Sequence, residues 1–301
     1  MNEKCFDLSP SEIKQANQTD PVFTTREEFE NALRQLGVHK NIKMVVHSSL
    51  GSLGKFEGGA ENLCQCLMDM VSEDGLLMLP TLSWYPKDGE DFTYDPENTV
   101  VSTGIIPETF RKLPGVVRSL DPTHSMSVWG KDKLDYIRHH HQLPTMHRNS
   151  PLGLLEQAGG YCLLIGCWTS TTFMHVVETS CHAPCLGSRT EEYKAIINGR
   201  QVKLRAWNWR GGYCRGLRHE ELFGFMRQNN TLHECMLKRC HLMFFKLSDY
   251  RTAYSRLLLA PEGGCAGCPV RPRQVKQCVP SDWDEATDTL KPSDAFTEDV
   301  F

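Results

Sequence analysis

The stretch IKMVVHSSLGSLG, residues 42–54, decides the fold class, because it joins a short β-branched strand directly to a polar loop that contains glycine. Apolar residues then recur at helical spacing from Ala60 to Val71, which predicts an amphipathic helix over residues 60–72. The apolar run Leu76–Leu79 follows and is typical of a buried strand. Strand, helix and strand in this order form a βαβ unit, so we expect an α/β fold.

The flanking sequence continues this alternation. A capping box from Thr25 to Glu28 begins a helix that Gly37 ends, and Ser150-Pro151 begins a short helix before the apolar strand 161–166. Asn198-Gly199 between two β-rich segments, 193–197 and 202–207, is a strong hairpin signal. Residues 80–101 are irregular and aromatic, which suggests a loop over a site. Further helices are expected at 105–113, 217–227, 232–246 and 249–259.

Composition excludes several classes of protein. The chain has 301 residues, 40% hydrophobic and 23% charged, which suits a folded protein. With 33 Lys+Arg against 37 Asp+Glu, the net charge of -4 gives no global basic field, so nucleic acid is not the expected partner. No run approaches the roughly 18 apolar residues that span a membrane, and the first 20 residues lack a signal-peptide core. We therefore expect a soluble cytoplasmic protein whose 13 cysteines are reduced.

The chain divides into one main domain and smaller parts. We expect an N-terminal arm over residues 1–22, the α/β domain over 23–260, a Cys-bearing appendage over 261–280 and a mobile acidic tail over 281–301. No GxGxxG or GxxxxGK[ST] loop is present, so the sequence does not support a Rossmann or P-loop nucleotide site. It leaves homodimer formation open.

The loop after the first strand is a candidate ligand site. His47, Ser48 and Ser49, followed by Gly51 and Gly54, place hydroxyls and flexible backbone where open α/β sheets bind ligands. Backbone N–H groups there can hold a phosphate or an oxyanion. An ordinary Ser/Gly turn predicts the same residues.

A second candidate combines an imidazole and a carboxylate. Hydroxyl residues 170–172 precede a predicted helix on which His175 and Glu178 lie three residues apart, on one face. A carboxylate beside an imidazole orients the ring and raises its basicity, as a general base requires. A surface histidine with an ordinary helical neighbour is the alternative.

Two further clusters carry polar side chains. The turn from Arg118-Ser119 to His124-Ser125 can bind a phosphate or a carbonyl, although a turn held by its own hydrogen bonds has the same composition. Glu220 and Glu221 offer carboxylates at the start of a helix, where acidic residues also favour the helix dipole. The string His139–His141 is expected on a solvated face, because adjacent side chains diverge.

One cysteine pair has the spacing of a zinc half-site. Cys265 and Cys268 supply two ligands, and Cys214, with His219 or Cys278, is a candidate for the remainder. Such a site would be structural, since four protein ligands leave no open position. Without the other ligands the pair is two ordinary thiols.

Several motifs in this order resemble the aminoglycoside 3-N-acetyltransferase family. They are Val46-His47-Ser48-Ser49-Leu50, Leu79-Pro80-Thr81, Arg118-Ser119 with Pro122-x-His124-Ser125, Ser150-Pro151-Leu152, Leu163-Leu164-Ile165-Gly166 and Thr172-x-x-His175-x-x-Glu178. Residues 260–268 are similar to a Cys-bearing stretch at the end of some members. The resemblance implies a single αβα-type domain with a mixed sheet, acetyl-CoA as donor and an aminoglycoside antibiotic or related amine as acceptor.

The resemblance also implies roles. His175 would be the general base, with Glu221 or Glu220 as its partner and Glu178 nearby. Donor contacts are expected from two segments, namely His47, Ser48, Ser49, Leu50 and Gly54, and then Arg118, Ser119, His124 and Ser125. The chain departs from the family at Asp121, where a histidine is usual, and at residues 209–212, where some members carry acids that would contact a polycationic antibiotic.

Other functions remain to be compared. The many histidines, with Asp121 near His124, suggest a metal-dependent hydrolase, but no HxxEH or HxH signature is present. A non-catalytic homologue that binds an aminoglycoside or CoA is a further alternative. Cys167 and Cys181 leave a covalent route open, although direct transfer needs no enzyme intermediate.

Overall fold

The computed structural model describes residues 9–83, 92–169, 171–181, 183, 187–210, 218–265, 283–284, 289–290 and 301. Its centre is a seven-stranded mixed sheet with the strand order β11-β12-β8-β2-β4-β7-β6. β2 runs parallel to β4 and to β8, and the other neighbours pair antiparallel. The strands are β2 (Lys43–Ser48), β4 (Leu76–Pro80), β6 (Val117–Arg118), β7 (Met126–Gly130), β8 (Tyr161–Ile165), β11 (Leu232–Leu237) and β12 (Cys240–Lys246). The expected α/β fold with a mixed sheet is confirmed.

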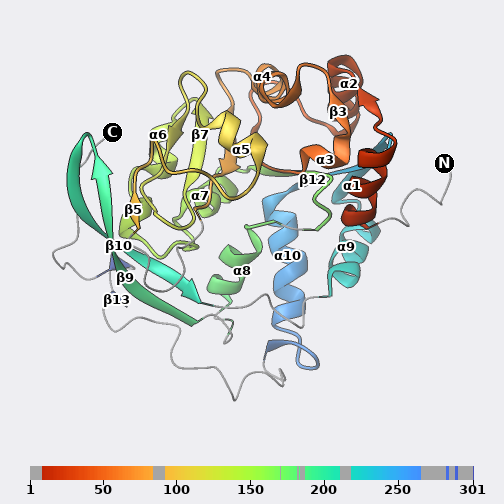
Figure 1. Ribbon diagram of the computed structural model, residues 1–301. Helices are drawn as coiled ribbons and strands as arrows, with labels where there is room; N and C mark the ends of the chain where they lie inside the picture. The colour runs from red at the N-terminus through yellow and green to blue at the C-terminus, as the bar shows by residue number, and fades with distance from the viewer. Residues whose placement is uncertain are drawn as a thin grey trace.

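Helices cover both faces of this sheet. In Figure 1, α2 and α4 lie above the sheet, and α8, α9 and α10 lie below it. The helices are α1 (Pro10–Thr19), α2 (Arg26–Leu36), α3 (Leu50–Leu53), α4 (Gly59–Val71), α5 (Ile105–Phe110), α6 (Lys133–Ile137), the 3-10 helix η2 (His140–Gln142), α7 (Pro151–Gln157), α8 (Met174–Ser180), α9 (His219–Gln228) and α10 (Leu247–Leu258). No helix in the described part of the chain has the length and apolar character needed to cross a membrane.

Successive side chains of the central strands enter two separate cores. In β2, Val45 faces the core shared with α8, α9 and α10, whereas Met44 and Val46 face the core shared with α2 and α4. The same alternation holds in β8, where Cys162 and Leu164 oppose Leu163 and Ile165. A strand buried on both faces needs a continuous apolar run, which is why these segments show no polar alternation.

A second, three-stranded sheet lies to one side. It pairs β5 (Thr93–Tyr94) with β9 (Gly187–Ile197), which forms a long hairpin with β10 (Arg200–Arg210). Asn198 and Gly199 both adopt positive φ, 51° and 73°, as a two-residue type I′ turn requires. The predicted hairpin is confirmed. Two short pairs, β1 (Phe23–Thr24) with β3 (Lys55–Phe56) and β13 (Trp283–Asp284) with β14 (Thr289–Leu290), complete the strands described.

Local signals placed several boundaries correctly. Thr25 and Glu28 form the predicted capping box of α2, and Gly37 ends that helix at φ 96°. Ser150 precedes α7 with Pro151 in its first turn, but the Ser150 hydroxyl makes no capping hydrogen bond. In α8 the residue at the N-cap is Phe173, so the expected hydroxyl cap is absent there.

The predicted helix over 232–246 is wrong. This segment forms the antiparallel strands β11 and β12, joined through Lys238 at φ 54°. Residues Leu242–Phe245 are buried on both faces because β12 pairs with β8, and a short apolar run of this kind fits a strand or a helix equally well in the sequence. The pairing of β12 with β8 therefore determines that this segment forms strands.

The described residues near the two ends include regular elements. The segment expected to be an arm contains α1, which packs beside α3. The segment expected to be a mobile tail contains β13 and β14, and Phe301 packs against the cores.

Candidate active site

A cavity of about 600 Å³ opens where β2 and β8 end. It is lined by residues 48–51, 103–106 and 166–168 and by Lys14. The carboxyl ends of adjacent parallel strands are where open α/β sheets bind ligands, so the fold places the loop singled out in the sequence at this position.

The cavity wall depends on close backbone packing between the two strand ends. The Ser49 N–H donates to the Ile165 carbonyl at 2.8 Å, and the Ser52 hydroxyl donates to the Gly166 carbonyl at 2.8 Å. Gly166 has φ 60°, and a Cβ there would lie 2.3 Å from the Ser52 Cβ. Only glycine fits this approach.

The lining combines apolar surface with one unpaired hydroxyl and one cation. The Ser48 Oγ atom is buried and has no hydrogen-bond partner among the described residues. Leu50 and Ile105 give apolar walls, and Lys14 is the one charged residue among the described residues of the lining. A buried polar atom without a partner is uncommon, and it fits a site that receives a polar ligand group. The residues present therefore suit the donor that the resemblance implies, acetyl-CoA.

His47, which precedes the cavity-lining Ser48 in β2, is not among the lining residues, and its ring contacts the segment that precedes α8. Its Nε2 lies 3.3 Å from the Thr171 Oγ1, and the Phe173 N–H donates to the same hydroxyl at 3.3 Å. Burial lowers the pKa of His47 to about 4, so the ring is neutral at pH 7.

The predicted imidazole and carboxylate meet on α8. The His175 Nδ1 and the Glu178 Oε2 are 2.7 Å apart, and the Tyr254 hydroxyl from α10 donates to the Glu178 Oε1 at 2.6 Å. The Glu178 side chain is 1% exposed and that of His175 18% exposed. A carboxylate on Nδ1 fixes the tautomer in which Nδ1 carries the proton and Nε2 is the basic nitrogen. The arrangement can take a proton from a bound nucleophile.

The carboxylate partner of His175 differs from the one expected. Glu221 forms an ion pair with Arg218 at 2.8 Å and is 42% exposed at the start of α9, and Glu220 is also exposed there. Glu178 takes the orienting position because three-residue spacing on one helix holds the two side chains together. The structure thus replaces Glu221 and Glu220 by Glu178 as the partner that contacts His175.

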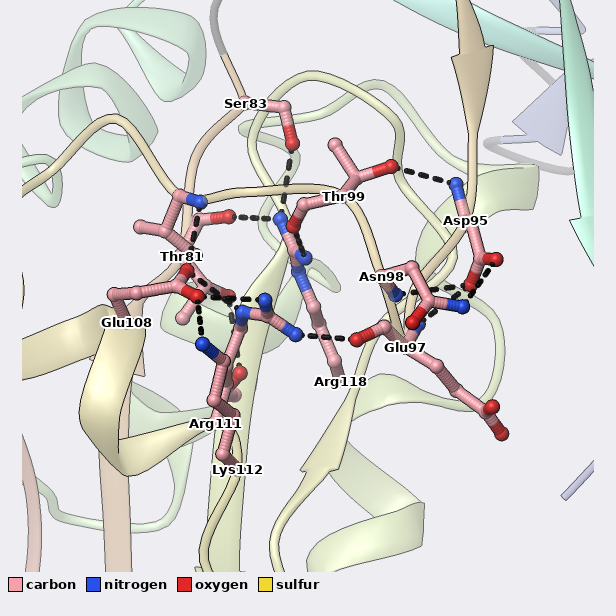
Figure 2. Close-up of polar contacts among 12 residues, drawn as sticks. Thr81, Ser83, Asp95, Glu97, Asn98, Thr99, Glu108, Arg111, Lys112 and Arg118 are labelled. Carbon is pink, nitrogen blue, oxygen red and sulfur yellow. Dashed lines mark hydrogen bonds and ion pairs between the residues drawn. The ribbon is translucent and has the colours of Figure 1, made fainter.

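Arg118 has a different environment from that predicted. Its guanidinium is buried and donates to the carbonyls of Thr81 and Thr99, at 2.7 and 2.6 Å, and to the Ser83 hydroxyl at 2.9 Å (Figure 2). It also donates to the Ser125 hydroxyl at 3.0 Å. It also lies over the Tyr94 ring, 5.4 Å from the centroid. Because these partners use the N–H donors of Arg118, its role is structural: it joins residues 81–83 and Thr99 to the turn that contains Ser125.

The rest of the predicted donor turn is equally buried. The Ser119 Oγ accepts from the Met126 N–H and lies 2.9 Å from the His140 Nδ1, and the Ser125 hydroxyl donates to the Thr81 carbonyl. Neither these serines nor Arg118 lines the cavity, so their geometry does not support the expected donor contact. Gly54 also lies outside the lining, where its φ of 77° serves close packing against the Val22 carbonyl.

An ion-paired group next to Arg118, formed by Glu108, Arg111 and Lys112, stabilises one wall of the cavity without lining it. Although burial alone would raise it, hydrogen bonds from Arg111 and Lys112 hold the pKa of Glu108 at about 2. The Val101 N–H donates to the same carboxylate at 2.9 Å, and Figure 2 shows this group beside Arg118. It fixes α5, whose first turn lines the cavity.

Asp121, the departure from the family pattern, has a structural environment. It is fully buried and accepts from the N–H groups of Thr123 and His124 at 2.9 and 2.7 Å, and from the hydroxyls of Thr123 and Thr145 at 2.8 Å each. Burial would raise the pKa of Asp121, but the charges of His140 and His124 and these hydrogen bonds lower it on balance. The Asp121 carboxylate therefore stabilises the turn over residues 121–124.

His124 lies within electrostatic range of His175. Burial lowers the pKa of His124 to about 4 against the opposing effect of Asp121, and the charge of His175 lowers it further. The Thr123 hydroxyl donates its proton to Asp121, so the 2.8 Å contact with the His124 Nδ1 requires Nδ1 to donate. His124 is thus a neutral ring at pH 7.

The predicted solvated face holds for His139, which is exposed, but not for the other two members of the histidine string. His140 and His141 are 1% and 4% exposed, and the His140 Nε2 lies 3.0 Å from the Thr145 carbonyl. They belong to the packing around Asp121.

The cysteine predictions have separate outcomes. Burial raises the pKa of Cys167 to about 12, which keeps this cavity-lining residue as a thiol and disfavours it as a nucleophile. Cys214 and Cys268 lie outside the described residues, as do Cys278 and residues 211–212, and Cys265 packs beside the core. Among the residues that the structure describes, no three His, Cys, Asp or Glu side chains form a metal-binding group.

The fold and site define an αβα protein with a strand-end cavity and an imidazole–carboxylate pair. A profile of the family described as aminoglycoside 3-N-acetyltransferase matches residues 45–255. This chain therefore belongs to the aminoglycoside 3-N-acetyltransferase family, as the sequence motifs indicated.

Similar proteins and structures agree with this assignment. The chain is 31% identical over 175 residues to the SPbeta prophage-derived aminoglycoside N(3')-acetyltransferase-like protein YokD of Bacillus subtilis (strain 168), which covers 51% of this chain and 64% of that protein. It is 26% identical over 197 residues to aminoglycoside N(3)-acetyltransferase IX of Micromonospora chalcea, covering 59% of this chain and 70% of that protein.

Solved structures share the fold. The crystal structure of YokD superposes with a TM-score of 0.69 at 24% identity, covering 82% of this chain and 98% of that one. Aminoglycoside acetyltransferase AAC(3)-Xa gives 0.71 at 21% identity, covering 83% and 96%. AAC-IIIb in a binary structure with CoASH gives 0.69 at 18% identity, covering 79% and 97%.

Proposed function

We propose that this protein transfers the acetyl group of acetyl-CoA to an amino group of an aminoglycoside, at the 3-N position that the family name specifies, with His175 as general base. The observation that carries the proposal is the 2.7 Å contact between His175 and Glu178 on α8, the helix that follows the cavity-lining residues 166–168 in the chain. Family membership and the names of the relatives support the substrate class.

The chemistry assigns one task to each group. Acetyl-CoA supplies a thioester as acyl donor, and the amine nitrogen attacks its carbonyl carbon. His175 takes the proton that the nitrogen loses, the carbon–sulfur bond breaks, and the imidazolium returns the proton to the departing sulfur, so CoA leaves as a thiol. Glu178 stabilises the imidazolium, and Tyr254 holds Glu178 in place. No covalent enzyme intermediate is needed, in agreement with the raised pKa of Cys167.

The supply of donor also fits the expected location. Acetyl-CoA is an intracellular metabolite, so the proposed reaction agrees with the cytoplasmic location predicted from the sequence. The hydrolase alternative is not favoured, because the family match points to acyl transfer.

The test measures CoA thiol release from acetyl-CoA with and without gentamicin or sisomicin, with mass spectrometry of the antibiotic. We expect amine-dependent release and one added acetyl group. His175→Ala should reduce kcat by about 10²–10⁴-fold with little change in donor affinity, and Glu178→Gln should reduce kcat less and change the pH profile.

Three results would contradict the proposal. Near wild-type turnover in His175→Ala would show that His175 is not the general base. Amine-independent hydrolysis would indicate a hydrolase. Saturable CoA binding without turnover on any amine would indicate a binding homologue.

A further inference from the structure

Helix α1 contributes to the cavity although it lies outside the segment that matches the family. The match covers residues 45–255, and α1 spans Pro10–Thr19. Lys14 of this helix nevertheless lines the cavity together with residues 48–51 and 166–168. The wall of the donor cavity is therefore built from more than the family segment.

α1 is fixed in this position by specific contacts. The buried Asn17 amide donates to the carbonyls of Gly51 and Ser52, at 2.9 and 3.1 Å, in α3. Arg239, in the turn between β11 and β12, donates to the Asn17 Oδ1 at 3.1 Å and pairs with Asp20 at 2.8 Å. Ile13 is 6% exposed, so one side of the helix packs on the domain. These contacts hold α1 against the loop that forms the cavity floor.

Lys14 extends along this loop toward the cavity. A Cβ built on Gly51 would lie 3.4 Å from the Lys14 Cγ, so the aliphatic part of the lysine runs beside that residue. The charge of Lys14 reaches the cavity-lining Cys167, whose pKa it lowers against the larger effect of burial. Among the described residues, the Lys14 ammonium has no ion-pair or hydrogen-bond partner, and the lining contains no carboxylate.

A lone cation at the rim of a partly apolar cavity suits an anionic ligand. Leu50, Ile105 and Trp168 line the same cavity, and Trp168 and Ile105 are 44% and 56% exposed. CoA combines an apolar arm with a nucleotide that carries a pyrophosphate and a 3′-phosphate. Lysine binds phosphate as a compact point charge on a flexible stem.

We propose that α1 is part of the donor site and that Lys14 binds a phosphate group of CoA. This inference rests on the proposed function, since it assumes that the cavity receives CoA. It adds a specificity residue from a segment that the family match does not include. Lys14 would select for the phosphorylated donor over the bare pantetheine thioester.

The experiment measures dissociation constants of CoA, 3′-dephospho-CoA and pantetheine by calorimetry. The variants are Lys14→Ala and Lys14→Glu, with Gln15→Ala as a control on the same helix and Lys40→Ala as a control for loss of one exposed positive charge. Lys14→Ala should weaken the binding of CoA about three- to tenfold, and Lys14→Glu should weaken it more. The loss of affinity in both variants should be smaller at high salt, because salt screens the charge interaction. Pantetheine affinity should not change, and neither control should change CoA affinity.

The dephospho-CoA arm identifies the phosphate. If Lys14→Ala weakens CoA but not 3′-dephospho-CoA, the lysine contacts the 3′-phosphate; equal weakening of both places it on the pyrophosphate. Either pattern supports the proposal. CoA affinity unchanged in both Lys14 variants, or an equal loss for pantetheine, would overturn it while leaving the proposed function in place. A wild-type protein that binds no CoA would overturn both.

Discussion

The loop 48–51 and the turn 118–125 contain similar residues, and the structure uses them in opposite ways. Both carry serines near a strand end, and the sequence predicts donor contacts for both. The loop opens on a cavity of about 600 Å³ and contains a buried hydroxyl without a partner among the described residues. In the turn, Arg118, Ser119 and Ser125 are buried, and their polar groups have protein partners. Unused hydrogen-bonding capacity, rather than residue type, distinguishes a ligand site from a structural turn.

Removing the guanidinium should have the largest effect on stability. Arg118→Met should lower the free energy of unfolding by about 3 kcal/mol or more, because it removes the buried donors to the Thr81 carbonyl and to the Ser83 and Ser125 hydroxyls, and the part-buried donor to the Thr99 carbonyl. Denaturant unfolding followed by tryptophan fluorescence measures the change. Arg34→Met, at an exposed ion pair of α2, is the control and should cost less than about 1 kcal/mol. A stable Arg118→Met protein that has lost CoA binding would restore Arg118 as a donor residue.

Asp121 tests whether the departure from the family pattern is structural. Asp121→Asn should destabilise the protein by about 2 kcal/mol, because an amide replaces one of the two oxygens that together accept four hydrogen bonds. Turnover per folded molecule and the order of preference among aminoglycosides should stay the same. A changed preference with unchanged stability would show instead that Asp121 contacts the acceptor.

The two serines sharpen the comparison directly. Ser48→Ala should weaken CoA binding about three- to tenfold and leave the free energy of unfolding unchanged or raise it by up to about 1 kcal/mol, since an unpaired buried hydroxyl is removed. Ser119→Ala should do the opposite, with a loss of about 1–2 kcal/mol in stability and no change in CoA affinity. Calorimetric binding and denaturant unfolding of both variants decide the matter. Identical behaviour of the two variants would remove the distinction.

A further expected effect is a pH dependence of stability. The pKa values of His47 and His124 lie at about 4 in the folded protein, below the ordinary value near 6.5. Between these pH values the unfolded chain binds protons that the folded protein does not, so stability falls as the pH decreases from about 6.5 to 4. His47→Gln should flatten this slope, whereas His39→Gln, at an exposed site, should not. An unchanged slope in His47→Gln would show that burial does not keep its ring neutral.

Patterns carried by consecutive residues predicted much of the fold. The capping box at Thr25, the Asn198-Gly199 turn and the apolar strands at 42–47 and 161–166 depend on local chemistry, and the structure confirms them. The strands β11 and β12 could not be recognised this way, because their apolar run is short and pairing with β8 fixes its conformation.

In the candidate site too, the contacts within one helix could be predicted from the sequence, whereas those between distant segments could not. The contact between His175 and Glu178 follows from spacing on one helix, whereas the expected partner Glu221 lies elsewhere. Lys14 escapes prediction, because a lysine on an amphipathic helix carries no signal of its own in a segment expected to be an arm. The capping box from Ser9 to Glu12 is the available clue that residues 10–19 form an ordered helix.

The 2.7 Å contact on α8 joins two groups that belong to the same helical turn. Because both side chains start from α8, a displacement of this helix as a unit would carry the imidazole and the carboxylate together. The orientation of the His175 ring depends on contacts within residues 175–178, whereas the position of α8 relative to the sheet depends on the segment that joins β8 to α8. A redesign that lengthens or shortens that segment would alter which acceptors reach the base without changing how the base is held.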